Sequence, residues 1–279
     1  MTQDTHTGLW DVLGRSVCGA SHRRRGAGNQ DAIAWSRAEN SALAVAVADG
    51  HGSAASFRSA TGAQFAVQAA VSVLRDFAEQ FSACDAAVTA AAALPEQLVA
   101  AWRMMVNRDL ALTPFIHSER AALNGSEGAH WRAYGSTVLA ALATPSHVVY
   151  LQLGDGDILI VSQDGAVARP WPRDTRLLGV ETTSLCGPDA VEETRFAIEP
   201  HTGASPAMVL LATDGYANSF REDHGFLRTG VDLLEIIRES GFDGVERNLE
   251  SWLNEASELG SGDDITLAVL CRAEGSHGR

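Results

Sequence analysis

The sequence predicts an α+β domain in which antiparallel sheets are covered by helices. Segments with strand and helix patterns come in blocks, with strands first, then helices, then strands again, unlike the regular alternation that builds a parallel sheet. Hydrophobic residues make up 46% of the 279 residues, which is enough for a large buried core. No low-complexity linker divides the chain. We therefore expect one domain over residues 1–279, with its core at about 14–271 and short flexible ends.

The first predicted elements are three strands. Residues 14–22 and 32–35 have the pattern of short strands, with a polar connection at 23–30 between them. The run 42–48 is apolar throughout and has valine at alternate positions. Its length and its β-branched residues favour a strand that is buried on both faces.

Helical patterns occupy the next part of the chain. Apolar residues recur at three- and four-residue spacing from 53 to about 81, which predicts an amphipathic helix. The alanine-rich run 86–93 lies among helix formers and is interpreted as helix. Pro95 fits the first turn of a further helix over 95–110. Residues 113–132 are expected to form an irregular surface segment.

Strand patterns then return. Three short apolar runs separated by turn residues predict an antiparallel meander over 136–143, 147–153 and 157–162. The pair Asp164-Gly165 is interpreted as a turn. The remaining elements are expected as strands at 195–198, 207–213 and 265–271 and as helices at 231–239 and 244–259.

Carboxylates stand at the ends of several of these strands, at Asp31, Asp49, Asp214, Asp263 and Asp264. If the strand ends coincide, like charges at about 4 Å would repel by several kcal/mol, and a divalent cation would relieve that repulsion. All-oxygen ligands favour Mg²⁺ or Mn²⁺ over zinc. Two ions sharing one carboxylate could hold a water and lower its pKa, so that hydroxide attacks phosphorus. Any single Asp-Gly pair is also a common turn, which is the simpler interpretation of each one alone.

The net charge of −14 excludes a general affinity for nucleic acid, which requires a basic face. Its simplest role is solubility. The first residues lack a signal-peptide pattern, and no apolar run approaches the roughly 20 residues that span a bilayer. Four widely spaced cysteines without a C-x-x-C pair are predicted to be free and mostly buried thiols. We therefore expect a cytoplasmic protein without nucleic-acid or membrane partners.

Six short motifs, in this order, resemble the metal-dependent protein phosphatases of the type 2C class, in their bacterial form. They are Asn29-Gln30-Asp31, Val47-Ala48-Asp49-Gly50-His51-Gly52, Gly135-Ser136-Thr137, Leu153-Gly154-Asp155-Gly156-Asp157, Ala212-Thr213-Asp214-Gly215 and Gly262-Asp263-Asp264-Ile265-Thr266. The resemblance covers nearly the whole chain. It implies a four-layer α/β/β/α sandwich of two antiparallel sheets, and hydrolysis of phosphoserine or phosphothreonine in proteins at a site with two Mg or Mn ions.

The resemblance also implies roles for the metal ligands. Asp49 would bridge both ions, and the carbonyl of Gly50 would bind one of them. Asp214 and Asp263 would complete the other ion's ligands, and Asp31 would support metal-bound water. A protein substrate of this kind implies an opposing serine/threonine kinase, while the oligomeric state is not indicated.

His51 would protonate the oxygen of the leaving serine or threonine. An alkoxide is a poor leaving group and needs a general acid, and histidine titrates in the right range. The family places an arginine before the acidic pair to bind phosphate, and a guanidinium fork suits that task. Here Arg25 is favoured and Arg23 is the next candidate, with a shift of one residue that Gly26-Ala27-Gly28 would allow. Each of these arginines could equally be a solvated loop residue.

The chain departs from the family pattern at two positions. Gln30 stands where glutamate is usual, which predicts weaker binding of the second metal. Arg132 occupies the position of a carboxylate that binds a third ion in many members, which puts a third ion in doubt here. These losses leave two alternatives open, a catalytically weak relative that binds phosphoproteins as a sensor or scaffold, and a hydrolase of small phosphate esters.

Overall fold

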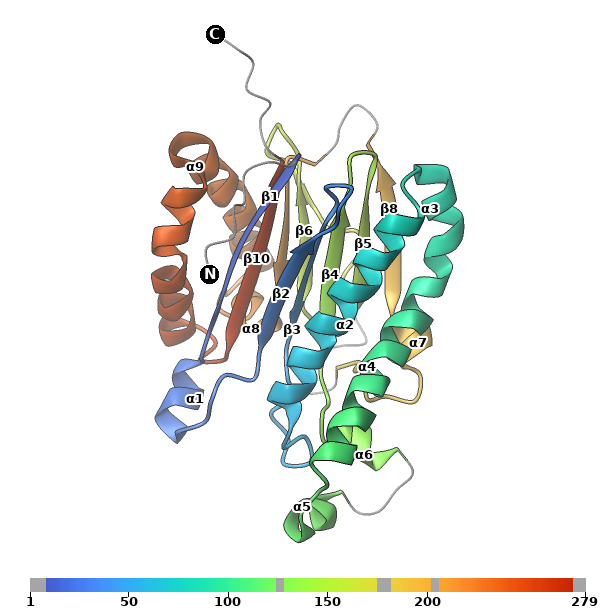
Figure 1. The fold of residues 1–279 in the computed structure, drawn as a ribbon. Helices are drawn as coiled ribbons and strands as arrows, with labels where there is room; N and C mark the ends of the chain where they lie inside the picture. The colour runs from blue at the N-terminus through green and yellow to red at the C-terminus, as the bar shows by residue number, and fades with distance from the viewer. Residues whose placement is uncertain (1–8, 124–127, 175–181, 202–205, 273–279) are drawn as a thin grey trace.

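The computed structural model describes residues 9–123, 128–174, 182–201 and 206–272. In this part of the chain, two five-stranded antiparallel sheets lie face to face, and helices cover both outer faces (Figure 1). The predicted α+β sandwich of four layers, α/β/β/α, is therefore confirmed. Within the same residues, no helix is both long enough and apolar enough to span a bilayer.

The two sheets draw their strands from both ends of the sequence. The first sheet has the order β1 (Trp10–Val17), β10 (Ile265–Arg272), β9 (Met208–Ala212), β6 (Asp157–Val161) and β7 (Val167–Ala168). The second has the order β2 (Ala32–Arg37), β3 (Leu43–Ala48), β4 (Val138–Ala143), β5 (His147–Leu153) and β8 (Arg195–Pro200).

The central strand β3 shows why its sequence is apolar throughout. Leu43, Val45 and Val47 face the first sheet and form the core between the sheets. Ala44 and its neighbours on the other face pack against the outer helices. Since successive side chains of a strand point to opposite faces, a strand covered on both sides has no polar position. The small alanines allow the helix layer to approach the sheet closely.

Three long helices form the outer layers. Figure 1 shows α2 (Ser59–Gln80) and α4 (Leu94–Leu112) on the second sheet and α9 (Asp223–Leu259) on the first. Gly241, with φ of 68° and ψ of −178°, interrupts α9 between the two helices that the sequence predicts. The shorter helices are α1 (Ala20–Arg25), α3 (Cys84–Ala90), η1 (Ala91–Ala93), α5 (His117–Ala122), α6 (Ala129–Arg132), α7 (Ala190–Glu193) and α8 (Asp214–Ala217).

The predicted strand over 14–22 is wrong in its second half. β1 pairs with β10 only as far as the Val17–Ile265 pair, where β10 begins, so the chain has no ladder partner beyond it. Residues 20–25 form α1 instead. Gly26 ends this helix with φ of 68°, a conformation that glycine adopts without strain.

The predicted meander over 136–162 is also wrong. β4 and β5 are neighbours, but β6 belongs to the other sheet, where it pairs with β9 and β7. The chain changes sheet at Gly154, whose φ is 113° and whose Cβ, if present, would lie 2.5 Å from Thr137 Cγ2. The turn at Asp164-Gly165 is confirmed, because it joins β6 to β7.

Two smaller expectations need correction. The helix expected from residue 53 begins at Ser59, and the segment expected to be irregular contains α5 and α6. The four cysteines are free thiols, as predicted, but only Cys271 among them is buried.

Candidate active site

The carboxylates expected at strand ends meet at one edge of the sandwich. The Ala32–Ala48 pair places Asp31, just before β2, beside Asp49, just after β3. In the first sheet, antiparallel pairing of β9 and β10 brings Asp214 and Asp263 to corresponding ends. The short connection from β5 to β6 joins the two sheets at this same edge and carries Asp155.

These carboxylates act on one another electrostatically. Burial, followed by the charges of Asp31, Asp263 and Asp155, raises the pKa of Asp49 well above its usual range. Burial and the charge of Asp49 do the same to the pKa of Asp214. The structure therefore brings the predicted acidic residues together, and it adds Asp155 to them.

Asp31 links the two sheets at this edge. Its Oδ2 accepts a hydrogen bond of 2.8 Å from the hydroxyl of Thr213, the residue after β9. Burial raises the pKa of Asp31 to about 7, helped by the charges of Asp264 and Asp214 and opposed by that hydrogen bond. The side chain is buried, and its Oδ1 has no hydrogen-bond partner among the described residues.

Asp49 and Gly50 are held by the segment before β4. The amide of Asp49 donates to Thr137 Oγ1 at 3.0 Å, and the amide of Thr137 donates to the Asp49 carbonyl at 2.9 Å. A Cβ on Gly50 would lie 2.6 Å from the Gln30 carbonyl oxygen and 2.8 Å from that of Ser59. Only glycine fits this close approach of three backbone segments.

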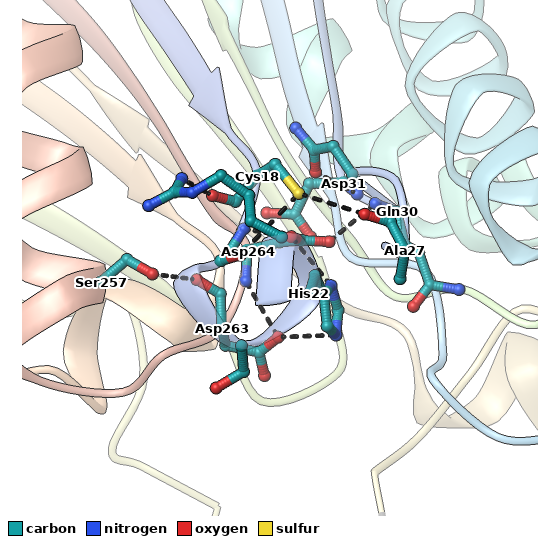
Figure 2. Close-up of polar contacts among 12 residues, drawn as sticks. Cys18, His22, Ala27, Gln30, Asp31, Ser257, Asp263 and Asp264 are labelled. Atoms are coloured by element: carbon teal, nitrogen blue, oxygen red, sulfur yellow. Dashed lines mark hydrogen bonds and ion pairs between the residues drawn. The ribbon is translucent and has the colours of Figure 1, made fainter. Parts of the chain in front are cut away.

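His22 faces the acidic pair before β10. His22 Nδ1 lies 2.9 Å from Asp264 Oδ1, without hydrogen-bond alignment, and its Nε2 lies 3.6 Å from Asp263 Oδ1 (Figure 2). Asp264 also accepts from the amides of Gly19 and Gln30, at 2.6 and 2.7 Å. Asp264, just before β10, thus holds the chain segment that follows β1 and the one that precedes β2. The Asp263 side chain, in contrast, is 53% exposed.

Gln30 turns its amide toward helix α2. Its Nε2 donates to Ser59 Oγ at 2.9 Å, and its Oε1 faces the space beside Gly52. The side chain therefore lies beside Gly52 and next to Asp31, where a carbonyl oxygen can serve as a metal ligand but brings no charge.

His51 lies next to the carboxylates and against Gly135. Its amide donates to the Gly135 carbonyl at 3.0 Å, and a Cβ on Gly135 would lie 2.5 Å from the imidazole Cδ2. Its Nε2 lies 2.7 Å from Ser184 Oγ. Burial lowers the pKa of His51, and the charge of Asp155 partly opposes that shift.

The two arginines proposed for phosphate binding sit on α1. Arg23 Nη1 donates to Asn254 Oδ1 at 2.8 Å, and its Nη2 pairs with Glu258 Oε1 at 3.2 Å, so its guanidinium faces α9. Arg25 donates from Nε to the Ser21 carbonyl at 3.2 Å and is exposed. Of the two, Arg25 is the one whose side chain is not directed at α9.

Two cavities flank the acidic edge. One, of about 380 Å³, includes Asp155, Asp214 and Asn218 in its wall, with Arg169 and Arg173 beyond them. The other, of about 760 Å³, is an open cleft bounded by His51, Arg132, the loop 182–190 and Glu193. A ligand at the carboxylates can therefore extend past His51 on one side and past Asp214 on the other.

The residues of this edge fit divalent cations. Asp31, Asp49 and Asp214 hold protons more tightly than usual because each carboxylate is buried near others, and a bound cation relieves the same repulsion. The unpartnered Oδ1 of Asp31 offers a further oxygen. His22, Asp263 and Asp264 present ligand atoms within 4.8 Å of one another. The predominance of oxygen ligands favours a hard cation.

The chain was compared with known proteins. A family model described as protein phosphatase 2C matches residues 18–254. No curated protein sequence matches the chain. Among solved structures, the Staphylococcus aureus serine/threonine phosphatase Stp1 is 15% identical, with a TM-score of 0.59, over 98% of this chain and all of the other.

The Mycobacterium tuberculosis serine/threonine phosphatase PstP is 18% identical, with a TM-score of 0.58, over 95% of this chain and 99% of the other. A structure of the PstP catalytic domain, with two manganese ions, has the same identity and coverage and a TM-score of 0.56. At these identities the likeness shows a shared fold. Because the family model spans most of the sequence, the chain belongs to the protein phosphatase 2C family.

Proposed function

We propose that this phosphoprotein phosphatase removes phosphate from serine and threonine side chains with the help of two bound Mg²⁺ or Mn²⁺ ions. The observation that carries the proposal is the group of buried carboxylates with raised pKa values, at one sheet edge and beside a histidine that borders an open cleft. The two manganese ions of the PstP catalytic domain support the same metal requirement.

Each acidic residue has a separate task in this proposal. Asp49, which feels the charges of Asp31, Asp263 and Asp155, would be shared by both ions, with the Gly50 carbonyl as a further ligand of one. Asp214 and Asp263, from the first sheet, would complete the other, and Asp31 would orient water by hydrogen bonding. When bound, the ions would supply Lewis acidity that neutralises charge and makes water a stronger nucleophile.

His51 would act as the general acid. The leaving oxygen is attached to the substrate polypeptide, so a proton donor in the wall of the cleft implies that the polypeptide lies in the cleft. Arg25 is the preferred phosphate ligand, because Arg23 is engaged with Asn254 and Glu258 on α9. An open cleft of about 760 Å³ suits a protruding phosphorylated segment better than an enclosed metabolite, which argues against a hydrolase of small esters.

The first experiment is hydrolysis of a phosphothreonine peptide with Mn²⁺, with EDTA, and with an Asp214→Asn variant. We expect turnover that requires Mn²⁺ and falls by at least about 100-fold in the variant, since a metal ligand loses its charge. Phosphate release is measured directly. A folded, Mn²⁺-loaded protein without turnover would instead favour the phosphoprotein-binding sensor or scaffold.

Gln30 provides a second prediction. A Gln30→Glu variant should bind the weaker of the two Mn²⁺ ions about tenfold more tightly, because a charged oxygen replaces a neutral one beside the same ion. Isothermal titration calorimetry of the metal-free proteins measures this, with Gln97→Glu, an exposed position on α4, as a control outside the predicted ligand set. Equal affinity of Gln30→Glu and the natural protein would remove Gln30 from the metal site.

The substrate class implies a partner. A serine/threonine kinase must supply the phosphoprotein, and phosphoproteomics of cells that lack the phosphatase should show serine and threonine phosphosites that rise. The free cysteines support a reducing, cytoplasmic location, which cell fractionation would test.

A further inference from the structure

The segment 182–187 forms one wall of the cleft and is docked beside His51. The amide of Leu185 donates to the carbonyl of Ser136 at 3.0 Å. This hydrogen bond attaches the segment to the residues just before β4. Ser136 in turn neighbours Gly50 through an isolated antiparallel bridge. This arrangement places Ser184 Oγ 2.7 Å from Nε2 of His51, although 133 residues separate the two in sequence.

The imidazole of His51 is enclosed on two sides. Gly135 lies against Cδ2, where any larger residue would collide with the ring. Ser184 contacts the adjacent nitrogen, Nε2. Backbone and side chain of His51 are therefore both fixed by residues that pack around the same segment, 135–136.

The hydrogen bonds of Ser184 indicate which partner donates. A serine hydroxyl has one proton and two acceptor lone pairs. Ser184 Oγ donates to the Ser136 carbonyl at 3.1 Å. It accepts from the Ser136 amide at 3.2 Å and, over a longer 3.4 Å, from the Cys186 amide, and the Cys186 thiol lies 3.2 Å from it. The Ser136 carbonyl accommodates this proton together with the Leu185 amide, because a carbonyl oxygen has two lone pairs. With its proton used there, Ser184 acts as an acceptor toward His51, and Nε2 carries a hydrogen.

We propose that Ser184 is a positioning residue that accepts a hydrogen bond from His51 Nε2–H and thereby leaves Nδ1 as the nitrogen that delivers a proton to the leaving oxygen. The proposal deepens the phosphatase function and rests on it. It also explains why a hydroxyl, and not a carboxylate, stands at this position, since a neutral acceptor orients the ring without adding another negative charge to the site.

The oxygen of water bonds to phosphorus, and the bond from phosphorus to the serine or threonine oxygen breaks with its electron pair on that oxygen. The Nδ1 proton of the imidazolium passes to this oxygen and gives the free hydroxyl. His51 remains as the neutral Nε2–H imidazole, still bonded to Ser184. The attacking water releases one proton to solvent, and His51 takes up one proton from solvent. The products are the alcohol and inorganic phosphate.

The kinetic test uses two substrates whose leaving groups differ in their need for an acid. A Ser184→Ala variant should lose about 10- to 100-fold in kcat on a phosphothreonine peptide, which is part of the 100-fold or more that a general acid contributes. On p-nitrophenyl phosphate, whose leaving group needs little protonation, the loss should stay below about threefold, and KM should change little on either substrate. A Ser184→Thr variant keeps the hydroxyl and should restore the peptide activity.

The chain offers a matched control. Ser146 Oγ lies 2.8 Å from Nδ1 of His147 in the turn between β4 and β5, at the opposite end of these strands, so Ser146→Ala removes the same kind of contact far from the cleft. It should leave both activities unchanged. In a His51→Ala background, Ser184→Ala should cause no further loss. An equal loss on both substrates, or additive losses in the double variant, would overturn the positioning role.

A spectroscopic measurement separates this proposal from the phosphatase function itself. Nitrogen-15 NMR of the metal-free, histidine-labelled protein reports which ring nitrogen carries hydrogen, and the His51 signals are identified by their absence from a His51→Gln variant. Neutral His51 should be in the Nε2–H form, and Ser184→Ala should shift it to a mixture of both forms. A dominant Nδ1–H form in the natural protein would refute the proposal even if the enzyme is active. If the protein is inactive but its His51 signals show the Nε2–H form and the expected change in Ser184→Ala, only the phosphatase function is refuted.

Discussion

An Asp49→Asn variant is expected to lose metal-dependent hydrolysis by at least about 1,000-fold in kcat/KM, and to be more stable than the natural protein when metal is absent. The first effect follows because the variant lacks the charge that both ions would share. The second follows because burial, and after it the charges of Asp31, Asp263 and Asp155, raise the pKa of Asp49 and thus oppose its ionised form. Loss of that charge relieves the repulsion.

Thermal unfolding with EDTA and with Mn²⁺ measures the second effect. Mn²⁺ should raise the Tm of the natural protein, because a ligand that binds only the folded state stabilises it, and should raise that of the variant much less. Asp164→Asn is the matched control, since it changes an Asp-Gly pair in the exposed turn from β6 to β7. A variant that stays active, or that is less stable than the natural protein in EDTA, would place Asp49 outside the metal site.

The opposite effects of Asp49→Asn on stability and on activity both come from the group of carboxylates at the sheet edge. Carboxylates that repel each other cost folding free energy, yet the fold places them where antiparallel strands end in register. The cost is tolerated because helices cover both sheets, and the sheets pack on each other through a buried core that includes Trp10 and Leu270. A bound cation then removes the repulsion among the carboxylates. The same repulsion therefore explains both the affinity for metal and the lower stability of the metal-free protein.

Much of this arrangement could be predicted because its signals are local. Asp49 follows an uninterrupted apolar strand and precedes glycine, and such a position can only be a strand end. Asp31 and the pair Asp263-Asp264 directly precede apolar runs, so their places at the edge also follow from sequence. Antiparallel pairing then brings the ends of neighbouring strands together, whichever residues supply the side chains.

The parts that were not predicted depend on contacts that are remote in sequence. The runs at β5 and β6 look alike, and nothing in either shows that they belong to different sheets, because pairing partners decide that. The six residues of α1 are too few for a helical period to be visible. Ser184 stands in a segment without periodicity, and its role exists only because Leu185 docks on Ser136.

Replacement of Asp31 by asparagine should change the pH dependence of stability in the metal-free protein. The pKa of Asp31 is raised from 3.8 to about 7 in the folded state, mainly by burial. Between these values the folded protein holds a proton that the unfolded chain has lost, so the stability of the natural protein falls as pH rises. This contribution is fully present below about pH 4 and is lost as pH passes 7.

The asparagine variant lacks this proton, so its stability relative to the natural protein should increase by about 1 to 3 kcal/mol from pH 4 to 7 and then level off. Urea unfolding in EDTA at several pH values measures the difference. Burial also lowers the pKa of histidines such as His147, but these groups are common to both proteins and their contributions cancel. A constant difference would mean that Asp31 is ionised throughout, and hence that its burial is offset by contacts stronger than the hydrogen bond from Thr213. In Mn²⁺ the natural protein should be more stable than the asparagine variant, because a bound cation stabilises the ionised carboxylate that burial disfavours in the metal-free protein.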